Sequence, residues 1–171
     1  MASSFSLAAK AINSCTAVSV QAVNFSGDKD VGQIRFTHLS TRASYTTDMH
    51  ATGSTMTIPV SNLPSASGVY MVESLEGNRV TSRVPLILHC DIDCCLAKLT
   101  NELIDCACDC PKCSVTLGKA QKVFLLLQSA VSASGDASTQ IGSQNSGYYK
   151  DILEKYNKAK SICDNSCGCN C

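Results

Sequence analysis

The chain has 171 residues, of which twelve are cysteine, and its 14 basic and 14 acidic side chains give a formal net charge of zero. A neutral chain lacks the basic surface typical of proteins that bind nucleic acid or acidic membranes, so we expect neither as a partner. Charged residues make up 16% of the chain, against about 25% in an average globular protein. A surface so poor in charge is typical of a subunit that packs against others, which favours a homo-oligomer.

Residues 1–10 contain no basic leader followed by an apolar stretch, and no later segment approaches the length of a membrane span. We therefore expect the chain to be made in the cytoplasm. A reducing cytoplasm favours metal thiolates over disulfides as the first explanation of the cysteines. Oxidation after cell lysis would reopen the disulfide option.

Residues 1–90 have the pattern of a sheet. Apolar and polar residues alternate over 16–23, 31–36 and 54–58. Residues 69–75 and 79–84 flank a short Glu-Gly-Asn turn, which predicts a hairpin whose second strand continues to residue 89. No helical pattern separates these strands, so the sequence predicts an antiparallel β-sandwich domain over 1–90.

Two histidines of this half, His38 and His50, have no neighbouring Cys or Glu at ligand spacing. Cys15 precedes a predicted strand and is expected to be a small buried apolar residue. His38 and His50 are predicted to lie in loops.

Residues 91–171 have the periodicity of three helices, which makes the predicted fold class α+β. Asp93 is expected to cap the first helix, and Pro111 suits the first position of the second. A polar stretch over 134–147 leads to the third. The predicted apolar stripes are Leu96, Leu99 and Leu103 in the first helix; Cys113, Leu117, Ala120, Phe124, Leu127 and Val131 in the second; and Tyr149, Ile152, Tyr156, Ala159 and Cys163 in the third.

An antiparallel packing of the second and third helices would place Cys113 beside Cys163 and bring two groups of cysteines together. Four thiolates can hold one zinc ion, so eight could hold two, and the same eight could instead form up to four disulfides. The sequence leaves this choice open. The predicted metal or disulfide residues are Cys106, Cys108, Cys110, Cys113, Cys163, Cys167, Cys169 and Cys171.

A separate trio, Cys90, Cys94 and Cys95, is expected to fix the joint between the sheet and the helices. His89 could join such a site as a ligand, but a single histidine at the end of a strand is more often a packed or exposed residue.

Cys110 and Cys113 form a C-x-x-C motif at a helix start, an arrangement that lowers a thiol pKa in redox enzymes. Those enzymes place the motif after a strand, whereas here a helix and further cysteines precede it, so the structural interpretation is favoured. The sequence contains no Gly-rich phosphate loop, no G-x-S-x-G and no H-E-x-x-H. We therefore expect a protein that is not an enzyme.

Five segments carry a resemblance to a known group of proteins: residues 63–70, 94–103, 106–113, the aliphatic helix to 131, and 156–163. Together they resemble small tailed-bacteriophage virion proteins, which join an N-terminal β-sandwich to a cysteine-bearing helical hairpin. The similarity covers residues 63–171. It implies a structural component of the neck, tail or capsid surface, present in symmetric copies with other virion proteins as partners.

Two other functions remain as hypotheses. The thiolate density suggests a protein that stores or delivers zinc or copper. The C-x-x-C motif suggests a redox protein.

Overall fold

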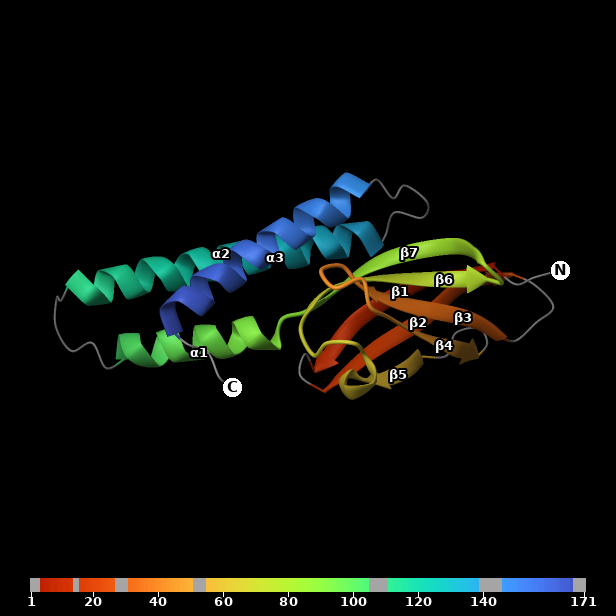
Figure 1. Cartoon of the computed structure of the whole chain (residues 1–171), viewed down its shortest axis with the longest axis horizontal. Coiled ribbons are helices and arrows are strands. Elements are labelled where there is room, and N and C mark those ends of the chain that lie inside the picture. Colours follow the sequence, from red (N-terminus) through yellow and green to blue (C-terminus); the bar gives the residue numbers. More distant parts are fainter. Residues whose placement is uncertain are drawn as a thin grey trace.

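The computed structural model describes the backbone of residues 4–13, 16–26, 31–50, 55–104, 111–138 and 146–167, and the side chains of 16–21, 32–48, 55–75, 77–104, 113–132 and 149–165. Two antiparallel sheets precede three helices, which confirms the predicted α+β class. The sheets lie at one end of an elongated molecule and the helices at the other (Figure 1).

Each sheet is built from strands paired with antiparallel neighbours. The first sheet has the order β1-β2-β5, with β1 at Ser4–Asn13, β2 at Ala17–Ser26 and β5 at Thr55–Pro59. The second has the order β4-β3-β6-β7, with β4 at Ser44–His50, β3 at Val31–His38, β6 at Gly68–Glu76 and β7 at Arg79–Leu88. A short 3₁₀ helix, η1, covers Val60–Asn62.

One core lies between the two sheets and contains alternate, inward-facing residues of β2, β3, β6 and β7, together with Ile58 of β5. Val18 and Val20 come from β2, and Ile34 and Phe36 from β3; all four are fully buried. The alternation that predicted β2, β3, β5, β6 and β7 is the alternation that fills this core. Strands β1 and β4 were not predicted, because β4 is rich in Ser and Thr and resembled a turn.

The predicted hairpin is confirmed by the pairing of Glu76 with Arg79 at the ends of β6 and β7. Gly77 has a φ of 60° in the two-residue turn between them. Glycine adopts this left-handed conformation without the steric cost that a Cβ would bring.

The helical half contains α1 at Cys90–Ile104, α2 at Pro111–Ser138 and α3 at Ser146–Cys167. Pro111 begins α2, as predicted, whereas α1 begins three residues before the predicted cap at Asp93. The acidic residues Asp91 and Asp93 lie in the first turn of α1, where they favour the helix through its dipole. Within the described part of the chain, no helix is long and apolar enough to span a membrane.

The predicted apolar stripes of α2 and α3 differ in how far they are buried. The α3 stripe is confirmed, since all five of its residues are buried. The α2 stripe is partly wrong, because Leu117, Phe124 and Val131 are 46%, 54% and 41% exposed. Leu127 is buried as predicted, and the buried face of the helix is completed by Val123 and Ala130, which were not in the predicted stripe. Apolar residues occur on most sides of α2, so their period alone does not identify which side of the helix is buried.

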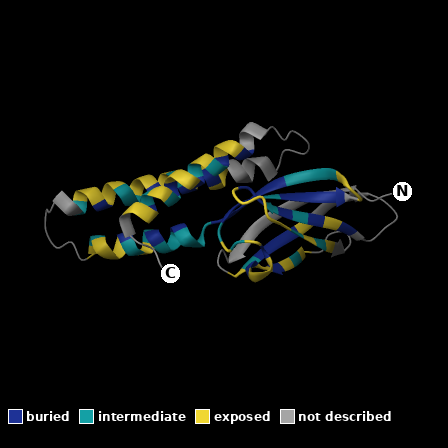
Figure 2. Cartoon of the chain, in the orientation of Figure 1, coloured by how far each residue is buried: buried dark blue, intermediate teal, exposed yellow. Residues whose placement is uncertain are grey.

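A second core joins the helices to the sandwich. Leu39, which follows β3, and Val69 and Ile87 of the second sheet pack with buried residues of all three helices. Figure 2 shows the buried positions continuing from the sheets into the helices. Because the second core includes sheet residues, the helical unit is packed onto the sandwich and is more than a tethered appendage.

Candidate functional site at the joint between sandwich and helices

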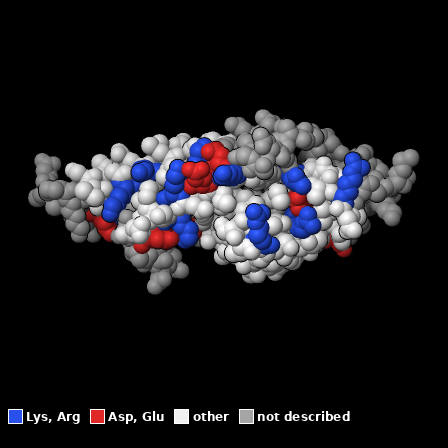
Figure 3. Space-filling model, turned by 45° about the horizontal axis from the view of Figure 1, so that its top comes forward, with Lys and Arg blue, Asp and Glu red and all other residues white. Residues whose placement is uncertain are grey.

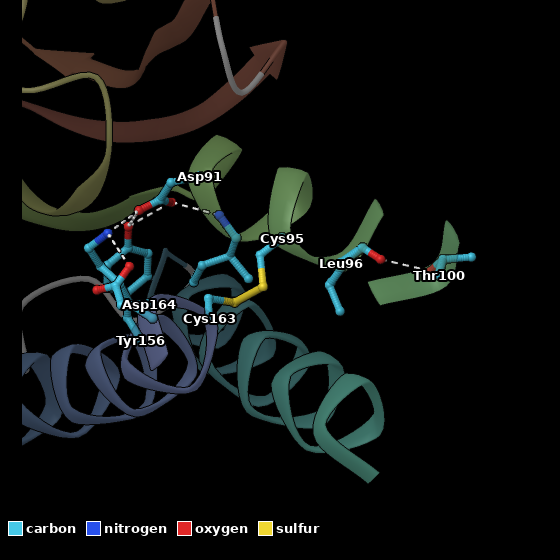
Figure 4. The surroundings of a disulfide bond; sticks show 9 residues. Asp91, Cys95, Leu96, Thr100, Tyr156, Cys163 and Asp164 are labelled. Atoms are coloured by element: carbon cyan, nitrogen blue, oxygen red, sulfur yellow. Dashed lines mark hydrogen bonds and ion pairs between the residues drawn. A yellow bond between two sulfur atoms is a disulfide. The ribbon is translucent and has the colours of Figure 1, made fainter. Parts of the chain in front are cut away.

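A disulfide between Cys95 of α1 and Cys163 of α3 lies beside the joint (Figure 4). The two Cα atoms are 5.8 Å apart, and 68 residues separate the cysteines in the sequence. Both side chains are buried in the second core. In the chain-entropy model, closing a loop of this length lowers the conformational entropy of the unfolded chain. This loss stabilises the folded state by about 4.4 kcal/mol. The bond therefore ties the last helix to the first.

All five cysteines whose side chains are described are disulfide-bonded, namely Cys90, Cys94, Cys95, Cys113 and Cys163. The predicted grouping was wrong in one respect, since Cys163 was placed with Cys113 and Cys95 in a separate trio. α3 packs against α1 as well as α2, and this second contact brings Cys163 to Cys95. Cys90, Cys94 and Cys95 lie in the first part of α1, and Cys95 reaches across to α3 beside the joint. The expectation that this trio fixes the joint stays a prediction.

The predicted metal site stays a prediction. Among the described residues, no group of three or more His, Cys, Asp or Glu side chains is placed to hold a metal ion. Most of the predicted ligands lie outside the described side chains: Cys106, Cys108, Cys110, Cys167, Cys169 and Cys171. Cys15 and the His50 side chain also lie outside them. His89, weighed as a ligand, instead places Nδ1 2.8 Å from the carboxylate of Asp93.

Asp91, in the first turn of α1, is the centre of a polar network next to the disulfide. The Tyr156 hydroxyl of α3 lies 2.9 Å from both carboxylate oxygens of Asp91, and it donates to them. Lys160 Nζ donates to Asp91 Oδ2 at 3.2 Å and lies 3.6 Å from Asp164 Oδ1. The backbone N–H of Ile92 donates to Asp91 Oδ1 at 2.9 Å. One carboxylate therefore holds α1 to two residues of α3.

The environment of this network shifts two pKa values upward. Burial raises the pKa of Tyr156 strongly, and the negative charge of Asp91 adds to the effect, so the hydroxyl keeps its proton. Burial by itself lowers the pKa of Lys160, but the carboxylates of Asp91 and Asp164 outweigh it and raise the pKa. Both shifts favour the protonation states in which Tyr156 and Lys160 bind Asp91.

A small cavity of about 230 Å³ opens between these groups and the sandwich. Ala66 and Ser67, which precede β6, line one side of it. The other lining residues are Cys90, Asp91 and Ile92 of α1 and Lys160, Cys163 and Asp164 of α3. Three separate parts of the chain thus meet here.

A buried charge cluster on the second sheet was not found from the sequence. Glu73 of β6 is 1% exposed and lies between Arg35 of β3 and Arg83 of β7 in the strand register. Arg35 donates to Glu73 Oε2 at 2.6 Å and 2.9 Å, and Arg83 donates to Oε1 at 2.8 Å. Both carboxylate oxygens therefore have a cationic partner. Arg35 and Glu73 are 38 positions apart in the sequence, so no short-range sequence pattern predicts that they meet.

His38 was predicted to lie in a loop, and this was wrong, because it ends β3 and is 6% exposed. Its Nε2 lies 3.1 Å from the Ser67 carbonyl, and its Nδ1 accepts the Thr41 N–H at 3.2 Å. Gly68 has a φ of 120°, and a Cβ at this position would overlap His38 Nε2. The ring fills the space that the missing side chain leaves, so His38 fixes the segment that lines the cavity.

The described groups at the joint bind one another. The sulfurs of Cys95 and Cys163 are bonded, the Tyr156 hydroxyl is directed at Asp91, and Lys160 bridges two carboxylates. Chemically, this arrangement can hold α1, α3 and the sandwich in a fixed relation. Comparison with known proteins adds no relative: no family model matches the chain, and no curated protein matches it significantly.

Proposed function

We propose that the chain is a non-enzymatic structural subunit of a bacteriophage virion, located at the neck, tail or capsid surface and repeated in symmetric copies. The observation that carries the proposal is the Cys95–Cys163 disulfide beside a joint whose polar groups bind one another. A covalent tie at this point suits a subunit that must transmit contacts from one end to the other without bending.

Disulfides also agree with an extracellular particle. They persist on virion surfaces and are disfavoured in a reducing cytoplasm. A subunit made in the host cytoplasm would close these bonds during or after release of the particle. This order of events reconciles cytoplasmic synthesis with five disulfide-bonded cysteines.

The surface supports partners of the same kind. Charged side chains are sparse and of mixed sign on the face shown in Figure 3. The sequence has a net charge of zero, which suits packing against other virion proteins better than binding to nucleic acid or to an acidic membrane.

Quantitative mass spectrometry of purified particles tests this function. Particles are taken from the culture that expresses the chain and banded on a density gradient, and peptides of the chain are counted against those of the major capsid protein. We expect the chain to travel with the particles at a fixed ratio after high-salt washing. Recovery only in the particle-free lysate would contradict the proposal.

A further inference from the structure

The Cys95–Cys163 bond borders the cavity at the joint with only one of its two residues. Cys163 lines the cavity, together with charged residues that include Asp91, Lys160 and Asp164. Cys95 is fully buried and does not line it. In Figure 4 the network around Asp91 lies beside the bond. A molecule that enters the cavity therefore meets Cys163 and not Cys95.

The size of the cavity limits what can enter it. Its volume is about 230 Å³, whereas pockets that hold a whole drug-sized ligand have roughly 300–1,000 Å³. The cavity is too small for part of a folded protein and admits a small molecule or the end of one. Because its wall carries the charged groups of Asp91, Lys160 and Asp164, it suits a polar occupant better than an apolar one.

A small polar thiol in this cavity can exchange with the disulfide. Disulfides react by attack of a thiolate on one of the two sulfurs, and access helps to decide which sulfur is attacked. Attack at Cys163 Sγ joins the small thiol to Cys163, breaks the bond to Cys95, and leaves the electron pair on Cys95 Sγ, which then takes up a proton. A second thiolate attacks the sulfur of the bound small molecule and releases Cys163 as a thiol. In sum, the protein disulfide and two small thiols become two protein thiols and one small disulfide.

The same route in reverse closes the bond. In the reduced chain, the Cys163 thiolate attacks a small disulfide, which releases one small thiol and leaves a mixed disulfide at Cys163. The Cys95 thiolate then attacks Cys163 Sγ and releases the second small thiol. The hydrogen bond from the Tyr156 hydroxyl to Asp91, at 2.9 Å, and the shared second core hold α3 beside α1 without the disulfide. Cys95 is therefore in place for the second step.

We propose that Cys163 is the site at which low-molecular-weight thiols and disulfides exchange with the Cys95–Cys163 bond, and that Cys95 is the resolving cysteine. A small disulfide then closes the bond after the chain has folded, and a small thiol opens it, without unfolding of the joint. This exchange depends on the disulfide and the cavity alone, so the particle measurements that test the virion assignment leave it untouched.

Trapping of the mixed disulfide tests which cysteine exchanges with small molecules. Full-length Cys95→Ser and Cys163→Ser chains are incubated with 2-hydroxyethyl disulfide, and the adducts are located by tandem mass spectrometry without reductant. We expect a hydroxyethyl adduct on Cys163 in the first chain and an unmodified Cys95 thiol in the second. Circular dichroism confirms that both variants are folded. An adduct on Cys95, or none on Cys163, would overturn the proposal.

A second test keeps the disulfide intact and narrows the cavity. Ala66 lines the cavity, so Ala66→Phe should obstruct it; Ala97→Phe is the matched control, because Ala97 is exposed on α1 and does not line the cavity. Reduction by 2-mercaptoethanol is stopped by alkylation and followed through the labelled Cys163 peptide. We expect reduction to be several-fold slower in Ala66→Phe than in the wild type and the control. Equal rates in the two variants would overturn the proposal.

The unfolded chain supplies the reference for intrinsic reactivity. In urea above the unfolding transition the cavity no longer exists, so the wild type and both phenylalanine variants should be reduced at the same rate. Slow reduction of Ala66→Phe that persisted in urea would show that obstruction of the cavity is not its cause, and would overturn the proposal.

Discussion

The sandwich and the helical unit bury their apolar side chains in different ways. The sandwich buries alternate residues of paired strands, so its core is specified strand by strand. The helical unit spreads its apolar residues over several sides, leaves part of α2 exposed, and adds a disulfide and an ion-paired network at the joint. The difference indicates that side-chain packing defines the sandwich, whereas α3 is positioned both by its buried stripe and by its cross-links to α1.

Removing the disulfide should produce the largest difference in stability between the helical unit and the sandwich. In Cys95→Ser/Cys163→Ser, we expect the free energy of unfolding to fall by about 4.4 kcal/mol, the loop-closure term for a 68-residue separation. Urea unfolding followed by circular dichroism at 222 nm measures the loss. The helices should unfold at lower urea than the sheets, and a single transition for both regions would contradict the distinction drawn between them.

The sandwich has its own weak point in the charge cluster around Glu73. Replacing both Arg35 and Arg83 by Met leaves a carboxylate that is 1% exposed without a cation, and we expect a loss of about 3 kcal/mol. This value is at the low end for a broken buried pair, because the two arginine side chains are themselves 38% exposed. Denaturant unfolding measures it, with Arg79→Met at the exposed turn as the control. Equal effects of the two changes would show that burial of Glu73 is not the cause.

Tyr156→Phe removes the hydroxyl that joins α3 to Asp91 while keeping the ring. A hydrogen bond to a charged group contributes about 2 kcal/mol, so we expect a loss of that size. Hydrogen exchange should become faster in α1 and α3 and stay unchanged in the paired strands β3 and β6. Unchanged exchange in both helices would indicate that the disulfide alone fixes the joint.

The smallest effect concerns Lys160 at high pH. Its folded pKa is raised, so the charged form stabilises the fold below the unfolded value of 10.5 and the contribution disappears as pH rises through the folded pKa. Lys160→Met should therefore differ from the wild type by roughly 0.5 kcal/mol at neutral pH, since the side chain is 41% exposed. The difference should vanish near the alkaline limit. Lys122→Met on α2 serves as the control. A stability difference between Lys160→Met and the wild type that grew as pH rose would contradict the predicted direction of the pH dependence.

Local sequence patterns predicted the elements better than the contacts between them. Alternation located β2, β3 and β7, and the period of α3 identified its buried side, because each of these signals is contained within one element. The buried side of α2 could not be predicted, since its apolar residues occur all around the helix. The pairing of Cys95 with Cys163 depends on how α3 lies across α1, and no spacing within either helix encodes that crossing.

The Cys95–Cys163 bond ties α3 to α1 at the joint. Disulfide mapping of the unreduced protein tests it directly: the chain is alkylated, digested without reductant, and its linked peptides are sequenced by tandem mass spectrometry. Fragmentation between Cys94 and Cys95 assigns the bond to one of these adjacent residues. We predict a peptide pair joined through Cys95 and Cys163. Alkylated thiols at both positions, or a bond from Cys163 to Cys113, would contradict the claim.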